Sequence, residues 1–392
     1  MKNKIKKISK EIFNELVEYR RHLHMHPELS FEEIKTSNYI TEILTKYDIK
    51  HTRGWAGHGV VAIIGKGKKC VALRADIDAL PISEENNVAY KSIVNGIMHA
   101  CGHDVHTASM LGAAIILKKL ESELSGKVKI IFQPGEEKLP GGASIMIKEG
   151  VLTKPKPTSI VGQHVHPPLE VGKIGIRSGM YMASADEIYI TVEGKGGHAA
   201  LPQKCIDTVL LAAEIITSLQ QLVSRRSDPT IPTVLSFGKI NSEGGATNVI
   251  PNKVIIEGTF RTMNEVWRKE AHKIIRDIAT NVAKASGGKC KVKIKVGYPT
   301  LTNNKNTYNK LKTYATDYLG KENVVELPIR MTSEDFSFYS QEIPACFYRL
   351  GTGNKLRNIV SPVHTPTFDV DERCLLVGSG LMAYYASMEL TH

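Results

Sequence analysis

Four side chains of the kinds that bind metal ions stand in two short segments of the sequence. Cys101 and His103 flank a glycine, which lets the backbone bend so that both side chains can reach one centre. Glu136 and Glu137 follow a Pro-Gly turn, and adjacent carboxylates repel each other unless a cation or proton neutralises one. A thiolate and an imidazole suit zinc. The pattern therefore predicts a metal site in which one glutamate is a ligand and the other moves protons.

Two more histidines extend this candidate set. His164 ends the apolar run 158–163, and His364 stands between two prolines near the C-terminus. With Cys101, His103 and Glu137 they make five candidate ligands, too many for one tetrahedral zinc with an open position. The set therefore suits two divalent ions that share a water molecule.

Hydrolysis of an amide needs a nucleophilic water and a proton for the leaving amine, and a metal site beside a free carboxylate supplies both. Glu136 is the candidate for that carboxylate. Two plainer interpretations remain open at this point: a buried thiol beside a hydrogen-bonded histidine, and a solvated Glu-Glu loop.

A later part of the sequence offers groups for a substrate. His198, in a glycine-rich loop, could donate a hydrogen bond to an oxyanion, while Asn248 and Arg261 could hold a carboxylate. From the residues alone, a surface loop and an exposed strand end explain these positions equally well.

The elements that must position these residues are predicted as an α/β layered domain with a largely parallel sheet. Strands are expected at 58–64, 69–76 and 126–133, with helices at 106–120 and 142–150. Polar residues, among them Asp76 and Asp78, stand at the ends of these strands, where ligands of such sheets collect.

From residue 184 the order becomes β-α-β-β-α-β, which predicts a four-stranded antiparallel sheet with two helices on one face. We interpret residues 183–297 as an inserted ferredoxin-like domain. Residues 1–182 and 298–392 then form the metal-binding domain, since α/β character resumes after the insertion.

Composition narrows the class of protein. The chain has 51 Lys and Arg against 40 Asp and Glu, scattered instead of clustered, so no dedicated nucleic-acid face is expected. This positive charge either steers anionic substrates or only keeps the protein soluble. No apolar run is long enough for a membrane span, and the basic N-terminus lacks the apolar stretch of a signal peptide. Six dispersed cysteines fit a reducing compartment, so a cytoplasmic location is expected.

Several motifs together resemble a family of dinuclear metal-dependent amidohydrolases. That family includes hippurate hydrolases, N-acyl-amino-acid amidohydrolases, N-acetyl-diaminopimelate deacetylases and indole-acetyl-amino-acid hydrolases. The resemblance rests on an ordered set of segments, RRHLH at 20–24, LRADIDALPI at 73–82, MHACGHDVHTA at 98–108, QPGEE at 133–137, GGHAALP at 196–202 and SPVH at 361–364.

The resemblance implies roles for individual residues. Two metals would be held by Cys101, His103, Glu137, His164 and His364, with Cys101 bridging them. Glu136 would be the general acid and base, and Asp78 would support the metal site. The inserted domain would be a lid and dimerisation unit whose His198 reaches a neighbouring subunit, and Asn248 and Arg261 would bind the substrate carboxylate. The run Lys138-Leu139-Pro140 departs from the glycine-rich stretch of relatives.

The expected function is hydrolysis of N-acyl amino acids by a homodimer with two zinc, manganese, cobalt or nickel ions. Two alternatives remain at this stage. One is a dipeptidase or carboxypeptidase of the same family, because dipeptides also carry a carboxylate beside the scissile amide. The other is a catalytically silent metal-binding relative, which the presence of Glu136 and all five ligands disfavours.

Overall fold

The computed structural model describes residues 1–244 and 246–391, and the chain forms two compact units. The first unit comprises Met1–Gly179, Thr302–Pro328 and the residues from Asp335 onward. The second comprises Met180–Leu301 and Ile329–Glu334. The short return segment 329–334, which the sequence assigns to the first domain, thus clusters with the second unit.

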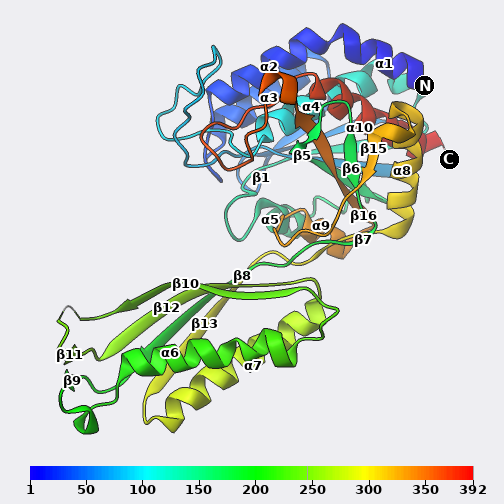
Figure 1. Cartoon of the computed structure of the whole chain (residues 1–392). Coiled ribbons are helices and arrows are strands. Elements are labelled where there is room, and N and C mark those ends of the chain that lie inside the picture. The colour runs from blue at the N-terminus through cyan, green and yellow to red at the C-terminus, as the bar shows by residue number, and fades with distance from the viewer. Residues whose placement is uncertain (245, 392) are drawn as a thin grey trace. The chain divides into compact units, whose positions relative to one another are not determined.

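The first unit is built on an eight-stranded mixed sheet (Figure 1). Its order is β1-β2-β4-β3-β5-β16-β6-β15. The four central strands β4, β3, β5 and β16 are parallel to one another, and the strands next to them, β2 and β6, run antiparallel to them. The strands are β1 (His51–Trp55), β2 (Gly59–Gly65), β3 (Cys70–Asp76), β4 (Lys127–Gln133), β5 (Ile160–Glu170), β6 (Ile174–Ile176), β15 (Val324–Glu326) and β16 (Ala345–Gly353).

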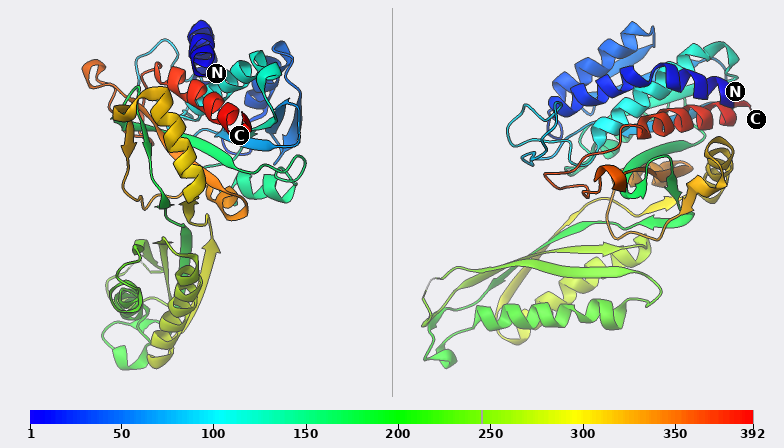
Figure 2. Two further views of the ribbon diagram at one scale, coloured as in Figure 1. Left: turned by 90° about the vertical axis from the view of Figure 1, so that its right-hand side faces the viewer. Right: turned by 45° about the horizontal axis from the view of Figure 1, so that its top comes forward.

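Helices cover both faces of this sheet, which gives the three layers expected of an α/β domain. The helices α1, α4 and α10 run side by side over one face (Figure 2), and α5 and α9 lie against the other. The helices are α1 (Lys2–Glu11), α2 (Phe13–Met25), α3 (Ile34–Lys46), α4 (His103–Lys119), α5 (Gly142–Lys148), α8 (Lys305–Leu319), α9 (Ser337–Glu342) and α10 (Cys374–Thr391). In the described part of the chain, no helix has the length and apolar character to cross a membrane.

Helix α4 differs from its prediction in one respect that matters for the site. The apolar pattern predicts a helix over 106–120, whereas α4 begins at His103. Gly102 precedes it with a φ of +79°, and a Cβ there would lie 2.6 Å from a methyl group of Val165. Glycine is therefore required where the chain turns into the helix. Consequently His103 is held by a helix and not by a loop.

The second unit has the predicted β-α-β-β-α-β order. Its antiparallel sheet has the order β10-β12-β8-β13, with α6 and α7 on one face (Figure 2). Buried residues alternate along β8, as a sheet with one covered face requires. The elements are β8 (Asp186–Glu193), α6 (Thr208–Leu219), β10 (Thr233–Ser242), β12 (Lys253–Thr262), α7 (Glu265–Ala285) and β13 (Lys289–Val296).

Two small ribbons were not predicted. One pairs β9 (Gly197–His198) with β11 (Val249–Ile250) inside the second unit. The other pairs β7 (Gly179–Met182) with β14 (Leu301–Asn303), where the chain passes between the units. Strands this short carry too little periodic pattern to be recognised in a sequence.

Candidate metal centre

The predicted ligands come together at the carboxyl edge of the central parallel strands. Strand β3 is followed by Asp78, β4 is followed by Glu136 and Glu137, and His164 lies on β5. Because parallel strands end at the same edge of a sheet, these side chains converge.

Distances between ligand atoms show one compact cluster. Cys101 Sγ lies 3.3 Å from His164 Nε2 and 3.2 Å from His364 Nε2. Glu137 Oε1 lies 3.4 Å from His364 Nε2 and 3.9 Å from His103 Nε2. Cys101 thus belongs to two overlapping groups of potential ligands, one with His103 and His164 and one with Glu137 and His364. These two groups are residues that could hold two divalent ions.

Hydrogen bonds on the far sides of two rings fix which nitrogen faces the cluster. His103 Nδ1 donates to Asp78 Oδ1 at 3.1 Å, and His164 Nδ1 donates to the carbonyl oxygen of Val165 at 2.8 Å. Carboxylate and carbonyl oxygens only accept, so each neutral ring carries its lone pair on Nε2. In both residues Nε2 is the atom that points at the other ligands. The rings are therefore oriented for metal binding.

The electrostatics of the cluster also fit cations. Among the described residues, the buried atoms His103 Nε2 and Glu137 Oε1 have no hydrogen-bond partner. Burial raises the pKa of the Cys101 thiol, and the carboxylates of Glu137 and Glu136 raise it further. Burial lowers the pKa of His103, but the surrounding carboxylates outweigh it and raise the value to about 10. Such a site attracts positive charge, and bound cations would satisfy the orphaned atoms and favour the thiolate.

Glu136 is buried next to the ligands but is held differently from Glu137. One of its carboxylate oxygens, Oε1, accepts a hydrogen bond from the backbone N–H of Asp335 at 3.2 Å. The side chain of Asp335 is itself paired with Arg74 and accepts from Gln133 at 2.7 Å. The carboxylate of Glu136 is therefore positioned by a buried network.

Asp78 connects the ligands to one another. Besides His103, it accepts hydrogen bonds from the backbone N–H of Glu137 at 2.9 Å and from Ser30 Oγ at 2.6 Å. These contacts outweigh the effect of burial and lower the pKa of Asp78. Its negative charge is thus directed at His103.

His106 is a supporting residue that we did not select from the sequence. It lies close to Asp76 and His103, but its Nδ1 donates to Asp76 Oδ1 at 2.5 Å and its Nε2 accepts from the Val165 N–H at 2.8 Å. Both ring nitrogens are therefore occupied, and His106 fixes the strand that carries His164. Its position three residues after His103, on the same face of α4, was the available signal.

The N-terminal RRHLH motif holds the start of α4. Arg20 Nε donates to Asp104 Oδ2 at 2.8 Å, and His24 Nδ1 lies 2.8 Å from the same oxygen. All three side chains are buried. Since Asp104 follows His103 directly, this ion pair anchors the first turn of the helix that presents the ligand.

His364 is the exception among the predicted ligands, because its side chain is half exposed. Its backbone adopts a left-handed φ of +64°, and its N–H donates to the Ala100 carbonyl oxygen at 2.8 Å. This bond ties the C-terminal loop to the segment that carries Cys101. A histidine in this conformation is held against its intrinsic preference.

The three predicted substrate residues lie in the second unit, but only two of them are neighbours there. His198 and Asn248 are exposed neighbours at the ribbon of β9 and β11, where the Ala199 N–H donates to the Asn248 carbonyl oxygen at 2.9 Å. Arg261 lies near the end of β12, and the eight residues from Lys253 span roughly 26 Å of strand. It donates to the Met331 carbonyl oxygen at 3.2 Å. Within one copy of this unit, Asn248 and Arg261 therefore cannot hold the same carboxylate.

Comparison with known proteins settles the family. The model of "Peptidase family M20/M25/M40" matches residues 72–387. The chain belongs to this family. It is 41% identical over 387 residues to IAA-amino acid hydrolase ILR1-like 4 of Arabidopsis thaliana, covering 97% of this chain and 87% of that protein. It is 40% identical over 304 residues to the N-acyl-L-amino acid amidohydrolase of Geobacillus stearothermophilus, covering 77% and 81%.

A solved structure shares the fold over nearly the whole chain. The chain aligns with the YXEP protein of Bacillus subtilis, a dinuclear metal-binding peptidase from the M20 family, with a TM-score of 0.84. The identity is 35%, over 97% of this chain and 99% of that one. The resemblance and the α/β fold predicted from the sequence are thereby confirmed. This M20 chain is a metal-dependent enzyme that hydrolyses amide bonds.

Proposed function

We propose that the protein hydrolyses N-acyl amino acids at a centre of two divalent ions, releasing a carboxylic acid and a free amino acid. The observation that carries the proposal is the position of Cys101 Sγ, within 3.3 Å of His164 Nε2 and 3.2 Å of His364 Nε2, beside Glu136 and Glu137. A thiol shared between two imidazoles, next to a second carboxylate, suits a dinuclear hydrolase.

The ions would be held by the thiol, the imidazoles and the carboxylate that form the two groups, namely Cys101, His103, Glu137, His164 and His364. The chemistry that divalent ions supply at such a site is Lewis acidity, which polarises a carbonyl group and makes water more acidic. Thiolate, imidazole and carboxylate together accept zinc, manganese, cobalt or nickel.

Glu136 would carry the proton. Its buried carboxylate takes the proton of the attacking water and then gives it to the departing amine. The N–H of Asp335 at Oε1 keeps the side chain in one orientation between these two transfers. Glu137 would then be the metal ligand of these two glutamates. Its backbone N–H donates to Asp78, which holds it in place.

Relatives suggest the substrate class. Their names include an N-acyl-L-amino acid amidohydrolase, an IAA-amino acid hydrolase and an N-acetyl-L-cysteine deacetylase of Bacillus subtilis. In all three the bond joins an acyl group to the nitrogen of an amino acid. We extend this linkage to the present chain and leave the acyl group open.

A second copy of the chain would complete the site. We propose a homodimer formed by the second unit, with His198 of one subunit donating to the oxyanion in the other. The exposed apolar side chains Val209 and Leu210 on α6 and the edge position of β10 support such an interface. The separation of Asn248 from Arg261 supports it further, because residues of two copies could meet where those of one cannot.

The proposal is tested by release of amino acids from a panel of N-acyl amino acids and dipeptides. The protein is stripped with a chelator and reloaded with zinc, manganese, cobalt or nickel. Release from N-acyl substrates that depends on metal supports the proposal. Faster release from dipeptides would identify a dipeptidase instead, and no release despite two bound ions would indicate a silent relative or an untested amide.

A further inference from the structure

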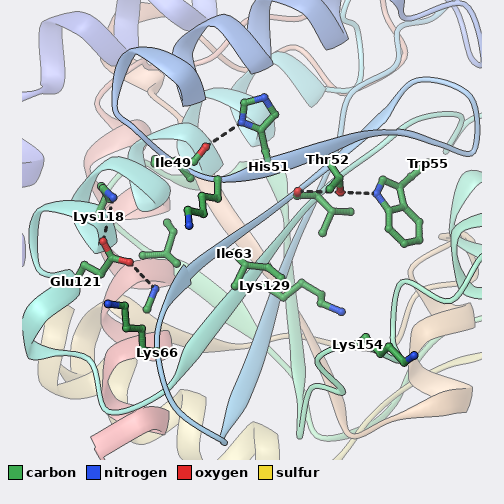
Figure 3. A pocket seen from close by; sticks show the side chains of 14 residues that line it. Ile49, His51, Thr52, Trp55, Ile63, Lys66, Lys118, Glu121, Lys129 and Lys154 are labelled. Carbon is green, nitrogen blue, oxygen red and sulfur yellow. Dashed lines mark hydrogen bonds and ion pairs between the residues drawn. The ribbon is translucent and has the colours of Figure 1, made fainter.

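A cavity in the first unit, away from the predicted metal centre, is lined by several lysines (Figure 3). It has a volume of about 630 Å³ and lies along β1 and β2, the outermost strands at one edge of the eight-stranded sheet. This volume falls in the range typical of small-molecule sites, roughly 300–1,000 Å³. Among the described residues, five lysines and one carboxylate, Glu121, line it; the lysines are Lys50, Lys66, Lys118, Lys129 and Lys154.

Lys129 is the most informative of these residues. It lies on β4, its side chain is buried with 2% of its surface exposed, and its ammonium group donates to the carbonyl oxygen of Val151. No carboxylate in the described part of the chain pairs with it. The titratable neighbour Cys70 is no counter-ion, because burial raises the pKa of its thiol. A buried ammonium without an opposite charge is unfavourable, and burial accordingly lowers the pKa of Lys129. An anion placed beside Lys129 in the cavity would favour its charged form.

The other lysines differ in how far the protein neutralises their charge: Lys118 is paired with carboxylates, whereas, in the described part of the chain, Lys66 and Lys154 are not. Lys118 is paired with Glu121 at 3.0 Å and with Asp48 at 3.2 Å. Glu121 also accepts a hydrogen bond from the Gly65 N–H at 3.1 Å, so its charge is directed at this end of the cavity. Figure 3 shows Lys66 near this pair, while Lys129 and Lys154 lie towards the other end. In the described part of the chain, neither Lys66 nor Lys154 forms an ion pair.

The rest of the lining is largely apolar. Val61 and Ile63 on β2 and the indole of Trp55 on β1 contribute to it. The Trp55 Nε1–H donates to Thr52 Oγ1 at 2.9 Å, which fixes the plane of the ring (Figure 3). A ligand of this cavity would therefore rest an apolar part on these side chains and offer its charge to the lysines.

The cavity is separate from the metal centre. From Lys129, β4 runs four residues to Gln133 before the turn that leads to Glu136 and Glu137, a span of roughly 13 Å. In the described part of the chain, the hydrogen bond of the Lys129 ammonium goes to Val151 and none joins it to a predicted metal ligand. An anion bound here would not meet the reacting atoms.

We propose that this cavity binds a small amphiphilic anion, a carboxylate or phosphate joined to an apolar group, at a site distinct from the metal centre. The Lys129 ammonium pairs with the anionic group, and Lys154, towards the same end of the cavity, supplies a second cation. The apolar group lies on Val61, Ile63 and the ring of Trp55.

Calorimetric titration of the metal-loaded enzyme with octanoate, octyl phosphate and 1-octanol tests the proposal. We expect saturable binding of at least one of the two anions and none of the neutral alcohol. Lys129→Met, which keeps the length of the side chain and removes its charge, should weaken that binding about tenfold or more. The exposed Lys154→Met should weaken it less and cannot disturb the core. Octanoate and octyl phosphate together show whether carboxylate or phosphate is preferred.

Lys127→Met is the matched control. Lys127 stands on the same strand and the same face, two residues before Lys129, but does not line the cavity. Lys127→Met should bind the anion like the wild type. Both Lys127→Met and Lys129→Met should keep amide hydrolysis. Binding that is unchanged in both Lys129→Met and Lys154→Met would place the anion elsewhere and overturn the proposal. So would equal binding of octanol, or no saturable binding at all.

Discussion

The predicted metal ligands of the first unit and the predicted substrate residues of the second are held in opposite ways. In the first unit, His103 and His164 each have one ring nitrogen bound on the far side, and Asp78 bonds three neighbours. In the second unit, His198 and Asn248 are exposed on a ribbon whose strands are two residues long. The metal centre is therefore preorganised within a single chain. In the proposed dimer, His198 and Asn248 would gain comparable order from a second copy of the chain.

The largest expected effect tests the preorganised side of this comparison. Glu136→Gln keeps the shape of the side chain but cannot accept a proton. We expect amide hydrolysis to fall about a thousandfold while both metal ions remain bound. Glu137→Gln is the matched variant, and it should lose metal as well as activity. Metal content and turnover, measured on the same preparations, distinguish loss of proton transfer from loss of metal. A Glu136→Gln enzyme that still hydrolyses amides would refute the role assigned to Glu136.

A smaller effect is expected from Asp78→Asn, which touches no substrate. Loss of the negative charge behind His103 should weaken metal binding roughly 10- to 100-fold, measured by competition with a chelator. Asp48→Asn, at an exposed carboxylate, is the control. Equal metal affinity in both variants would mean that Asp78 does not orient the ligand.

The proposed role of the exposed His198 in a neighbouring subunit is tested by mixing two inactive variants. If His198 acts in the neighbouring subunit, a dimer of one Glu136→Gln chain and one His198→Ala chain contains one intact site. Random association makes half of the dimers mixed, so the mixture should regain about a quarter of the wild-type activity. Activity that stays at the level of the separate variants would restrict His198 to its own subunit.

A test of stability instead of activity concerns a part of the second unit that is as well anchored as the predicted metal centre. Asp186 pairs with Arg268 at 2.5 Å and with His272 at 2.6 Å. Burial raises the pKa of Asp186, but these two partners outweigh it and hold the pKa below its ordinary value of 3.8. The stabilisation is thus complete above about pH 4 and is lost as the pH falls through the lowered pKa.

Asp186→Asn should therefore reduce the free energy of unfolding of the second unit at pH 7 by roughly 3 kcal/mol. The difference from wild type should shrink as the pH is lowered below 4. Trp267 reports on this unit in a Trp55→Phe background, because the chain has only two tryptophans. Unfolding curves that differ equally at pH 3 and pH 7 would contradict the assignment.

The fold was predictable because its long elements have clear periods. The alternation along β8 and the apolar run of β4 predict both sheets, and the order of elements predicts the ferredoxin-like unit. The β9 and β11 ribbon was missed because its strands are too short to show a period. The start of α4 was missed because His103 continues no apolar stripe.

The candidate site was predictable as a set of residue types but not as a network. Asp76 and Asp78 look alike in the sequence, yet Asp78 supports His103 while Asp76 is bound to His106 and Arg74. Asp335 carries no motif, and its N–H meets Glu136 only because distant segments fold together. Spacing along a chain identifies which atoms can bind, whereas pairing partners depend on tertiary contacts.

The backbone conformation of His364 costs stability, while its side chain serves the predicted metal centre. A left-handed conformation is about 1 kcal/mol less favourable for histidine than for glycine, so His364→Gly should relieve strain while it removes a ligand. Since half of this side chain is exposed, its replacement would leave no large void in the core. If a laboratory population were selected for heat resistance alone, we expect position 364 to be the first of the predicted metal ligands to be substituted.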